Sequence, residues 1–379
     1  MTILEYSCIR ESFRGVLLVK NLVQFSLCIV SLWLLGFGFA EGNRKSSFIG
    51  EDLFGGEDWL ESKDSGFKFN SLCTICCFII FLINGSIAEK SQYGTYILVA
   101  IAIPIFIWPT VVAWISSPDG WLIDETHESI IELGSIYVYT FAGTFSLVCS
   151  ILTGRRPIPA IDSPSSINYP LYVLGSFLTI LGLLGIPLYF IDSFDGIVFA
   201  NLWICGSVSS VTSLKLLTFL NTDIFKHYQS IYQGFMAGMV FITSSSNNVT
   251  PWESGLYGLM SGLVFSLGIF IFKKLKIDDV LMIAPTFLLP GIFGGVLPGF
   301  VDHRYGVYWG GWESGQTLGS NVVGTTVVFL WGCFWAIALF GPLKIFDCLN
   351  LPPALTESGL ENNCELKQSG FQVKILERK

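Results

Sequence analysis

Charged residues are scarce in this chain, and histidine is scarcer still. Only 13% of the 379 residues are Asp, Glu, Lys or Arg, whereas a soluble globular protein carries about 25%. This shortage, together with a hydrophobic share of 52%, excludes an ordinary soluble domain. The only histidines, His127, His227 and His303, lie outside the long apolar stretches. No imidazole is therefore available to carry protons inside a membrane.

The residue patterns that mark enzymes are also missing. The sequence has no nucleophile–base pair, zinc-ligand spacing or phosphate-binding loop at a plausible site, so we predict no enzyme activity and no cofactor or metal. The spacing of Cys73, Cys76 and Cys77 resembles a metal motif, but it lies inside an apolar stretch, where packing is the better interpretation. The net charge of −8 gives no reason to expect a nucleic-acid partner.

What the chain does contain is ten long apolar stretches. A bilayer core about 30 Å thick needs roughly 20 apolar residues per helix, and helices satisfy their own backbone polar groups in lipid. We therefore predict an all-α integral membrane protein whose first partner is the lipid bilayer. The expected spans are 15–40, 71–88, 95–116, 130–154, 169–191, 197–220, 230–246, 251–272, 279–299 and 321–346.

The basic residues predict the orientation of these spans. Of the 21 Lys and Arg, all but five fall on the side that holds both termini; the exceptions are Arg44, Lys45, Lys63, Lys68 and Arg304. The positive-inside rule places the richer side in the cytoplasm. We predict a multi-pass protein of the cell membrane with a cytoplasmic segment 1–14, a membrane domain 15–348 and a cytoplasmic tail 349–379. Lys20 is near enough to that surface for its side chain to reach it.

Several motifs carry a family likeness. Residues 232–243 read YQGFMAGMVFIT and are followed by VTPW at 249–252, while LKIDD at 275–279 precedes GIFG at 291–294. Further matches are GSIAEK at 85–90, DGWL at 119–122 and GLE at 359–361. In this order, the motifs resemble those of the ammonium transporter family (Amt/Mep/Rh). Asp278 and Asp279 are in addition expected to form a cap and first-turn pair at the cytoplasmic start of the span at 279–299.

The resemblance implies a fold and a substrate. The implied fold is an inverted repeat of five plus five helices. The implied assembly is a homo- or hetero-trimer, and the implied substrate is ammonium or ammonia. Members usually have eleven spans, and the first span matched here is the family's second. The resemblance thus implies an ammonium-transporter-like bundle of about ten helices from which the family's first helix is missing.

The resemblance also locates the pore, where this chain departs from the family pattern. The paired pore histidines of the family match Tyr139 and Phe287. Tyrosine titrates near 10 and cannot relay protons as histidine does. Tyr139 is expected either to line the pore or to be a buried tyrosine bonded to a neighbouring helix. Phe287 is expected either to offer a cation–π face or to fill the channel.

Four further positions match the family's pore. The two gate phenylalanines correspond to Ile75 and Ile186. The aromatic residue of the outer recruitment site corresponds to Ser116, and its acidic residue best matches Ile131, with Glu132 one place away. Three functions stay open: passage of ammonium or ammonia through an altered pore, a non-conducting regulatory or structural subunit of a hetero-trimer, and a channel for another small neutral solute.

Overall fold

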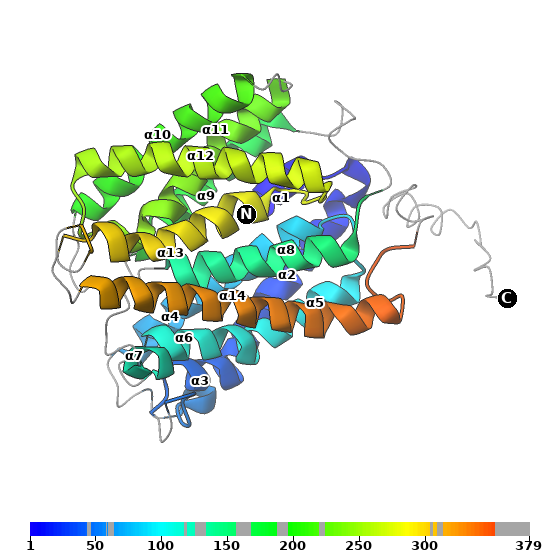
Figure 1. The fold of residues 1–379 in the computed structure, drawn as a ribbon. Helices are drawn as coiled ribbons and strands as arrows, with labels where there is room; N and C mark the ends of the chain where they lie inside the picture. Colours follow the sequence, from blue (N-terminus) through cyan, green and yellow to red (C-terminus); the bar gives the residue numbers. More distant parts are fainter. Residues whose placement is uncertain are drawn as a thin grey trace, which may run out of the picture.

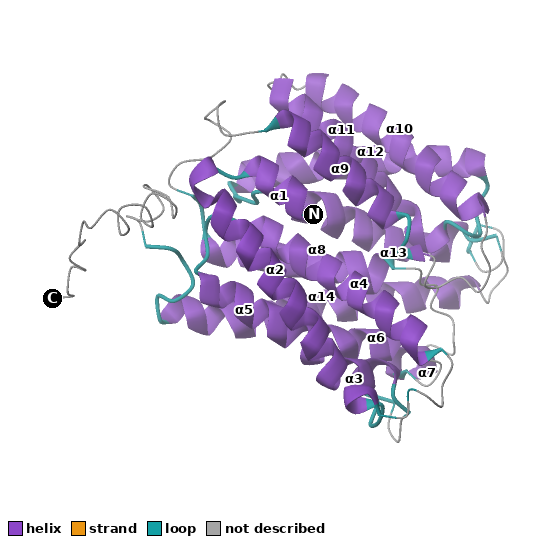
Figure 2. Ribbon diagram, turned by 180° about the vertical axis from the view of Figure 1, so that it is seen from behind, coloured by secondary structure: helices purple, strands orange, loops and turns teal. Residues whose placement is uncertain are grey.

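The structure is a computed structural model of residues 1–379. It describes the chain except residues 44–46, 58, 60–63, 117–119, 126–133, 157–167, 188–195, 220–223, 304–305, 309–313 and 353–379. Nearly all of the described part is helical (Figure 2). The described residues also form one isolated β-bridge, between Ser91 and Asn350.

The first half of the chain forms helices of very different lengths. They are α1 (Thr2–Cys8), η1 (Glu11–Phe13), α2 (Arg14–Ser31), η2 (Leu32–Gly36), α3 (Phe37–Glu41), η3 (Phe54–Gly56), α4 (Ser65–Ile87), α5 (Tyr93–Ala102), η4 (Ile103–Ile107), α6 (Trp108–Ser116), α7 (Trp121–Glu125), η5 (Ser135–Thr140), α8 (Phe141–Thr153) and α9 (Tyr169–Leu183).

The second half contains the longer helices. They are α10 (Gly196–Phe219), α11 (Ile224–Ile242), η8 (Thr243–Ser245), α12 (Pro251–Leu275), η9 (Ala284–Leu288), α13 (Leu289–Val301) and α14 (Ser314–Ile345). Four of the short segments, η2, η4, η5 and η9, are π-helical and continue directly into α-helices. A π-turn inside a longer helix is rare and is often found at a functional site.

The helices pack side by side into one bundle (Figure 1). The last helix, α14, lies along α8 and α13, and α10 packs against both α11 and α12. Eight of the described helical segments are long and apolar enough to cross a membrane. This confirms the predicted all-α membrane class, whereas the count of about ten spans is still a prediction. The short α1 packs against α9, and the boundary predicted at residue 14 is untested.

Two reciprocal glycine contacts hold the centre of the bundle together. A Cβ atom added at Gly143 would lie 2.5 Å from the Leu288 amide nitrogen, and one added at Gly291 would lie 3.0 Å from the Thr140 amide nitrogen. The sequence separation between Thr140 and Gly143 is the same as that between Leu288 and Gly291. Each half of the chain therefore contributes the same pair of positions to this crossing, as the inverted repeat requires.

Candidate functional site

The two positions that match the pore histidines meet at this crossing. Tyr139 lies in η5 and Phe287 in η9, and their exposed fractions are 0% and 1%. Their ring centroids are 6.0 Å apart, with planes inclined at 40°. Phe78 of α4 adds a third ring, 6.1 Å from that of Phe287. The position where the resemblance places imidazoles is thus filled by aromatic rings without a group that titrates near neutral pH.

Main-chain and hydroxyl contacts fix the segment that carries Tyr139. Gly134 has a φ of 122°, a conformation that side chains with a Cβ rarely adopt. Ser135 then donates its Oγ hydrogen to the Val240 carbonyl at 3.1 Å and accepts the Ser244 amide at 3.2 Å. Thr140 Oγ1 donates to the Ser135 carbonyl at 3.0 Å. The two Ser135 bonds tie the start of the Tyr139 helix to the end of α11 and to η8.

The segment that carries Phe287 begins with a side-chain cap. Asp279 Oδ2 accepts the Ala284 amide at 2.8 Å, so Asp279, which was predicted in the first turn, caps the helix from the residues before it. Asp278 differs from the prediction, because its carboxylate pairs with Arg156. Burial raises the pKa of Asp279 to about 6.

Replacing Asp279 tests the effect of this buried carboxyl. A carboxyl whose pKa rises from 3.8 to about 6 on folding holds its proton more tightly in the folded state, so stability falls as pH rises through that window. We expect Asp279→Asn, which keeps the capping oxygen, to stabilise the protein by about 3 kcal/mol at pH 8. The gain should vanish near pH 4 in thermal unfolding of the detergent-purified protein.

The neighbouring aspartate provides a matched control. Burial alone would raise the pKa of Asp278, but hydrogen bonds and the charge of Arg156 lower it. Asp278→Asn should therefore destabilise the protein at pH 8, which is the opposite sign. A difference between Asp279→Asn and wild type that is the same at pH 4 and pH 8 would contradict the assignment.

The other predicted pore positions are only partly described. Ile75 in α4 and Ile186 after α9 are 3% and 6% exposed and belong to the same hydrophobic core as Tyr139 and Phe287. Their role as a gate is still a prediction. Ser116 is the last residue of α6, but its side chain lies outside the description, and Glu132 falls outside the described residues.

A buried charged cluster joins the ends of several helices. Arg156, just after α8, binds both oxygens of Asp278, at 2.9 and 3.0 Å, and also contacts Glu89 at 3.3 Å. Arg10 approaches Glu89 at 3.5 Å. Lys90 donates to the carbonyls of Asp278 and Gly154, and burial lowers its pKa to about 8. The cluster links the helices that carry Tyr139 and Phe287 to the N-terminal segment.

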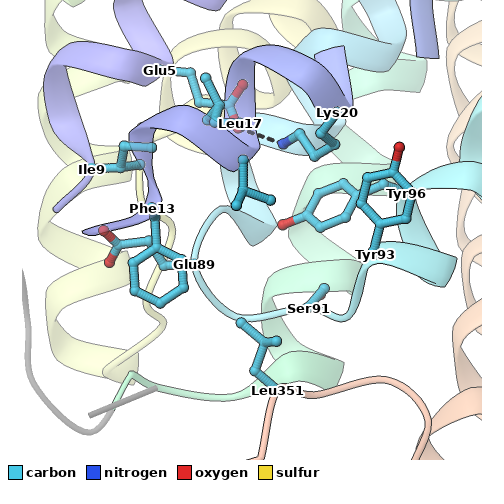
Figure 3. A pocket seen from close by; sticks show the side chains of 11 residues that line it. Glu5, Ile9, Phe13, Leu17, Lys20, Glu89, Ser91, Tyr93, Tyr96 and Leu351 are labelled. Atoms are coloured by element: carbon cyan, nitrogen blue, oxygen red, sulfur yellow. Dashed lines mark hydrogen bonds and ion pairs between the residues drawn. The ribbon is translucent and has the colours of Figure 1, made fainter. Parts of the chain in front are cut away.

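The same end of the bundle contains a cavity of about 250 Å³ (Figure 3). In it, Lys20 Nζ lies 2.9 Å from Glu5 Oε1 and 4.0 Å from the centroid of the Tyr96 ring. Asn21 donates to the second Glu5 oxygen at 2.9 Å. Lys20 was expected to reach the membrane surface, but the structure shows it 5% exposed. The ion pair with Glu5 compensates the Lys20 ammonium group, so this charge can be buried without contact with water.

Sequence reasoning missed both of these features. The residues of the charged cluster were visible in the motifs at 85–90 and 275–279, but their partners Arg10 and Arg156 lie far away in the sequence. Within the described part of the chain, no group of three His, Cys, Asp or Glu side chains is arranged to hold a metal ion. The described centre of the bundle is therefore an apolar contact between aromatic rings, and the charged cluster around Arg156 lies toward one end of it.

Comparisons with known proteins agree on one family. Residues 1–365 match the Ammonium Transporter Family. The chain is 25% identical to ammonium transporter 3 of Dictyostelium discoideum, over 95% of this chain and 87% of that protein. It is also 25% identical to ammonium transporter 1 member 2 of Oryza sativa subsp. japonica, over 94% and 79%.

Solved structures show the same fold. A structure described as a sensor Amt protein superposes with a TM-score of 0.83 at 26% identity, covering 95% of this chain and 92% of that one. The crystal structure of Saccharomyces cerevisiae Mep2 gives a TM-score of 0.77 at 18% identity, with 93% and 83% covered.

Proposed function

Because this chain belongs to the ammonium transporter family, we propose that it takes part in ammonium transport as a membrane subunit with little or no ammonium conduction of its own. The observation that supports this proposal is the contact between Tyr139 and Phe287. Both rings are buried at the crossing of the two π-helical segments, at the positions where the family's relay is expected.

The physical argument concerns the proton. An ammonium ion that enters an apolar pore must give up its proton or remain as a costly charge in the membrane. Imidazole accepts that proton near neutral pH, whereas a tyrosine hydroxyl titrates near 10 and a phenyl ring cannot accept one. The burial of both rings, in contact with each other, further supports a path that is closed to neutral ammonia.

A non-conducting subunit needs a conducting partner. We propose that the chain assembles with other family members, as the trimeric arrangement implied by the resemblance allows. In support, the chain keeps the family-like GIFG motif that begins with the close-packing Gly291, and the GLE sequence of the tail. The chain lacks the residue types that the resemblance expects at the pore positions, but it has the motifs that the resemblance assigns to the scaffold.

Uptake in yeast tests the proposal. We expect the chain alone to give no growth on limiting ammonium in cells that lack their own ammonium carriers, and no more labelled methylammonium uptake than Tyr139→Lys, which adds a charge at the crossing. Co-expression with a conducting relative should give a complex that co-purifies. Robust growth with the wild-type chain alone would overturn the proposal.

A further inference from the structure

A third aromatic ring meets the two rings at the central crossing. Phe78 of α4 has its ring centroid 6.1 Å from that of Phe287, and the two planes are inclined at 71°. Tyr139 is 6.0 Å from Phe287, with planes inclined at 40°. Phe287 therefore contacts rings from two different elements, α4 and η5. Phe78 is not one of the six pore positions predicted from the sequence, so the resemblance gives it no role.

The main chains at the crossing restrict how Phe287 can move. A Cβ atom added at Gly143 would lie 2.5 Å from the Leu288 amide nitrogen, so the segment that carries Phe287 is already in close contact with α8. Phe287 is 1% exposed, and protein interiors are close-packed. Its ring can leave its position by turning to another rotamer, and such a turn needs free space beside the ring.

The helix that carries Phe78 is anchored on its other sides. α4 packs along α8 and also against α2. The side-chain amides of Gln24 in α2 and Asn84 in α4 exchange hydrogen bonds of 2.7 and 3.3 Å, and the two residues are 1% and 0% exposed. Separating this pair would leave buried amide groups without partners, which is costly. The Phe78 ring is thus presented to Phe287 by a helix that is fixed in place.

Phe78 differs from the other two rings in its burial. Tyr139 and Phe287 are fully enclosed, whereas Phe78 is half-buried and packs against the same hydrophobic core. Truncating a half-buried ring removes fewer buried contacts than truncating an enclosed one, so it costs less stability. Phe78→Ala is therefore a change that frees space beside Phe287 in a protein that still folds.

We propose that Phe78 is a positioning residue of the crossing, whose ring prevents the Phe287 ring from turning aside. Three rings rather than two then keep the path closed: Tyr139 and Phe287 occupy it, and Phe78 holds Phe287 there. This inference rests on the proposed function, because it concerns the same crossing and the same lack of conduction.

Fluorine NMR of the detergent-purified full-length chain tests the contact without measuring transport. With para-fluorophenylalanine at position 287, we expect one resonance, because the ring has one position. Phe78→Ala should add a second resonance from the rotamer that becomes accessible, whereas Phe78→Tyr keeps a ring and should give one. The matched control is Phe81→Ala, since Phe81 is a half-buried phenylalanine of the same helix, and it should also give one. A single, unshifted resonance in Phe78→Ala would overturn the proposal.

Uptake tests whether this contact keeps the path closed. In yeast without its own ammonium carriers, Tyr139→His combined with Phe78→Ala should take up several-fold more labelled methylammonium than Tyr139→His alone. Combining Tyr139→His with Phe78→Tyr or with Phe81→Ala should give no gain. Equal uptake by Tyr139→His with and without Phe78→Ala, at equal amounts in the membrane, would overturn the role of Phe78 but not the proposed function. Uptake by the wild-type chain alone would overturn both.

Discussion

Arg156→Met should destabilise the protein by about 3–5 kcal/mol, the usual effect of removing one partner from a buried ion pair. Arg156 is 5% exposed and lies between Glu89 and Asp278. Without its guanidinium, the buried Glu89 carboxylate and the partly buried Asp278 carboxylate remain with less compensating charge. Thermal unfolding of the detergent-purified protein would show the loss as a large fall in melting temperature, since a few kcal/mol is a large share of a protein's stability.

The adjacent arginine provides a matched control for this prediction. Arg155 is exposed and donates to the Lys276 carbonyl, so Arg155→Met should change stability by less than about 1 kcal/mol. Arg156→Lys keeps the charge but cannot bind both Asp278 oxygens in the same plane, and its stability should lie between those of wild type and Arg156→Met. Equal melting temperatures for Arg156→Met and Arg155→Met would show that the cluster contributes little.

The double change Tyr139→His with Phe287→His should convert a chain without measurable ammonium uptake into one with at least about tenfold more uptake than wild type. Imidazole is smaller than either ring that it replaces, and it titrates near neutral pH. General acid–base groups at the right position typically contribute 10²–10⁴-fold to proton-transfer steps, so a tenfold gain is a modest expectation. The measurement is labelled methylammonium uptake in yeast that lacks its own carriers.

The single changes serve as controls for the double change. Tyr139→His alone leaves the Phe287 ring in the path, and Phe287→His alone leaves Tyr139, so each should stay near background. If the double variant is also inactive although it reaches the membrane in normal amounts, the pore is closed at further positions. Ile75 and Ile186, both buried in the same core, would then be the next residues to change.

The membrane class and the two central positions could be predicted from sequence because their signals are local. Apolar stretches identify membrane helices from length and composition alone. The motif at 275–279 lies close enough to Phe287 for the position to be found by counting. Tyr139 is likewise found from the stretch GSIYVY at 134–139, which resembles the family's first histidine motif, and the structure brings the two rings within 6.0 Å.

The features that escaped prediction depend on contacts between distant segments. The pair formed by Glu5 and Lys20 joins α1 to α2, and nothing near Lys20 in the sequence signals a buried carboxylate. The π-turns of η5 and η9 arise from backbone geometry that no composition encodes. Arg156 was assigned to a cytoplasmic loop, because a sequence pattern cannot show that Asp278 and Glu89 lie beside that loop.

The glycine contacts at the central crossing limit how this protein can change its permeability. Gly143 and Gly291 already bring one main chain against the other, so the two helices cannot approach further. Side chains larger than hydrogen at these positions would force them apart and disturb both halves at once. If the proposed pore runs through this crossing, its width there depends on the side chains at positions 139 and 287, and substitution at those positions is a simpler route to opening it than movement of the helices.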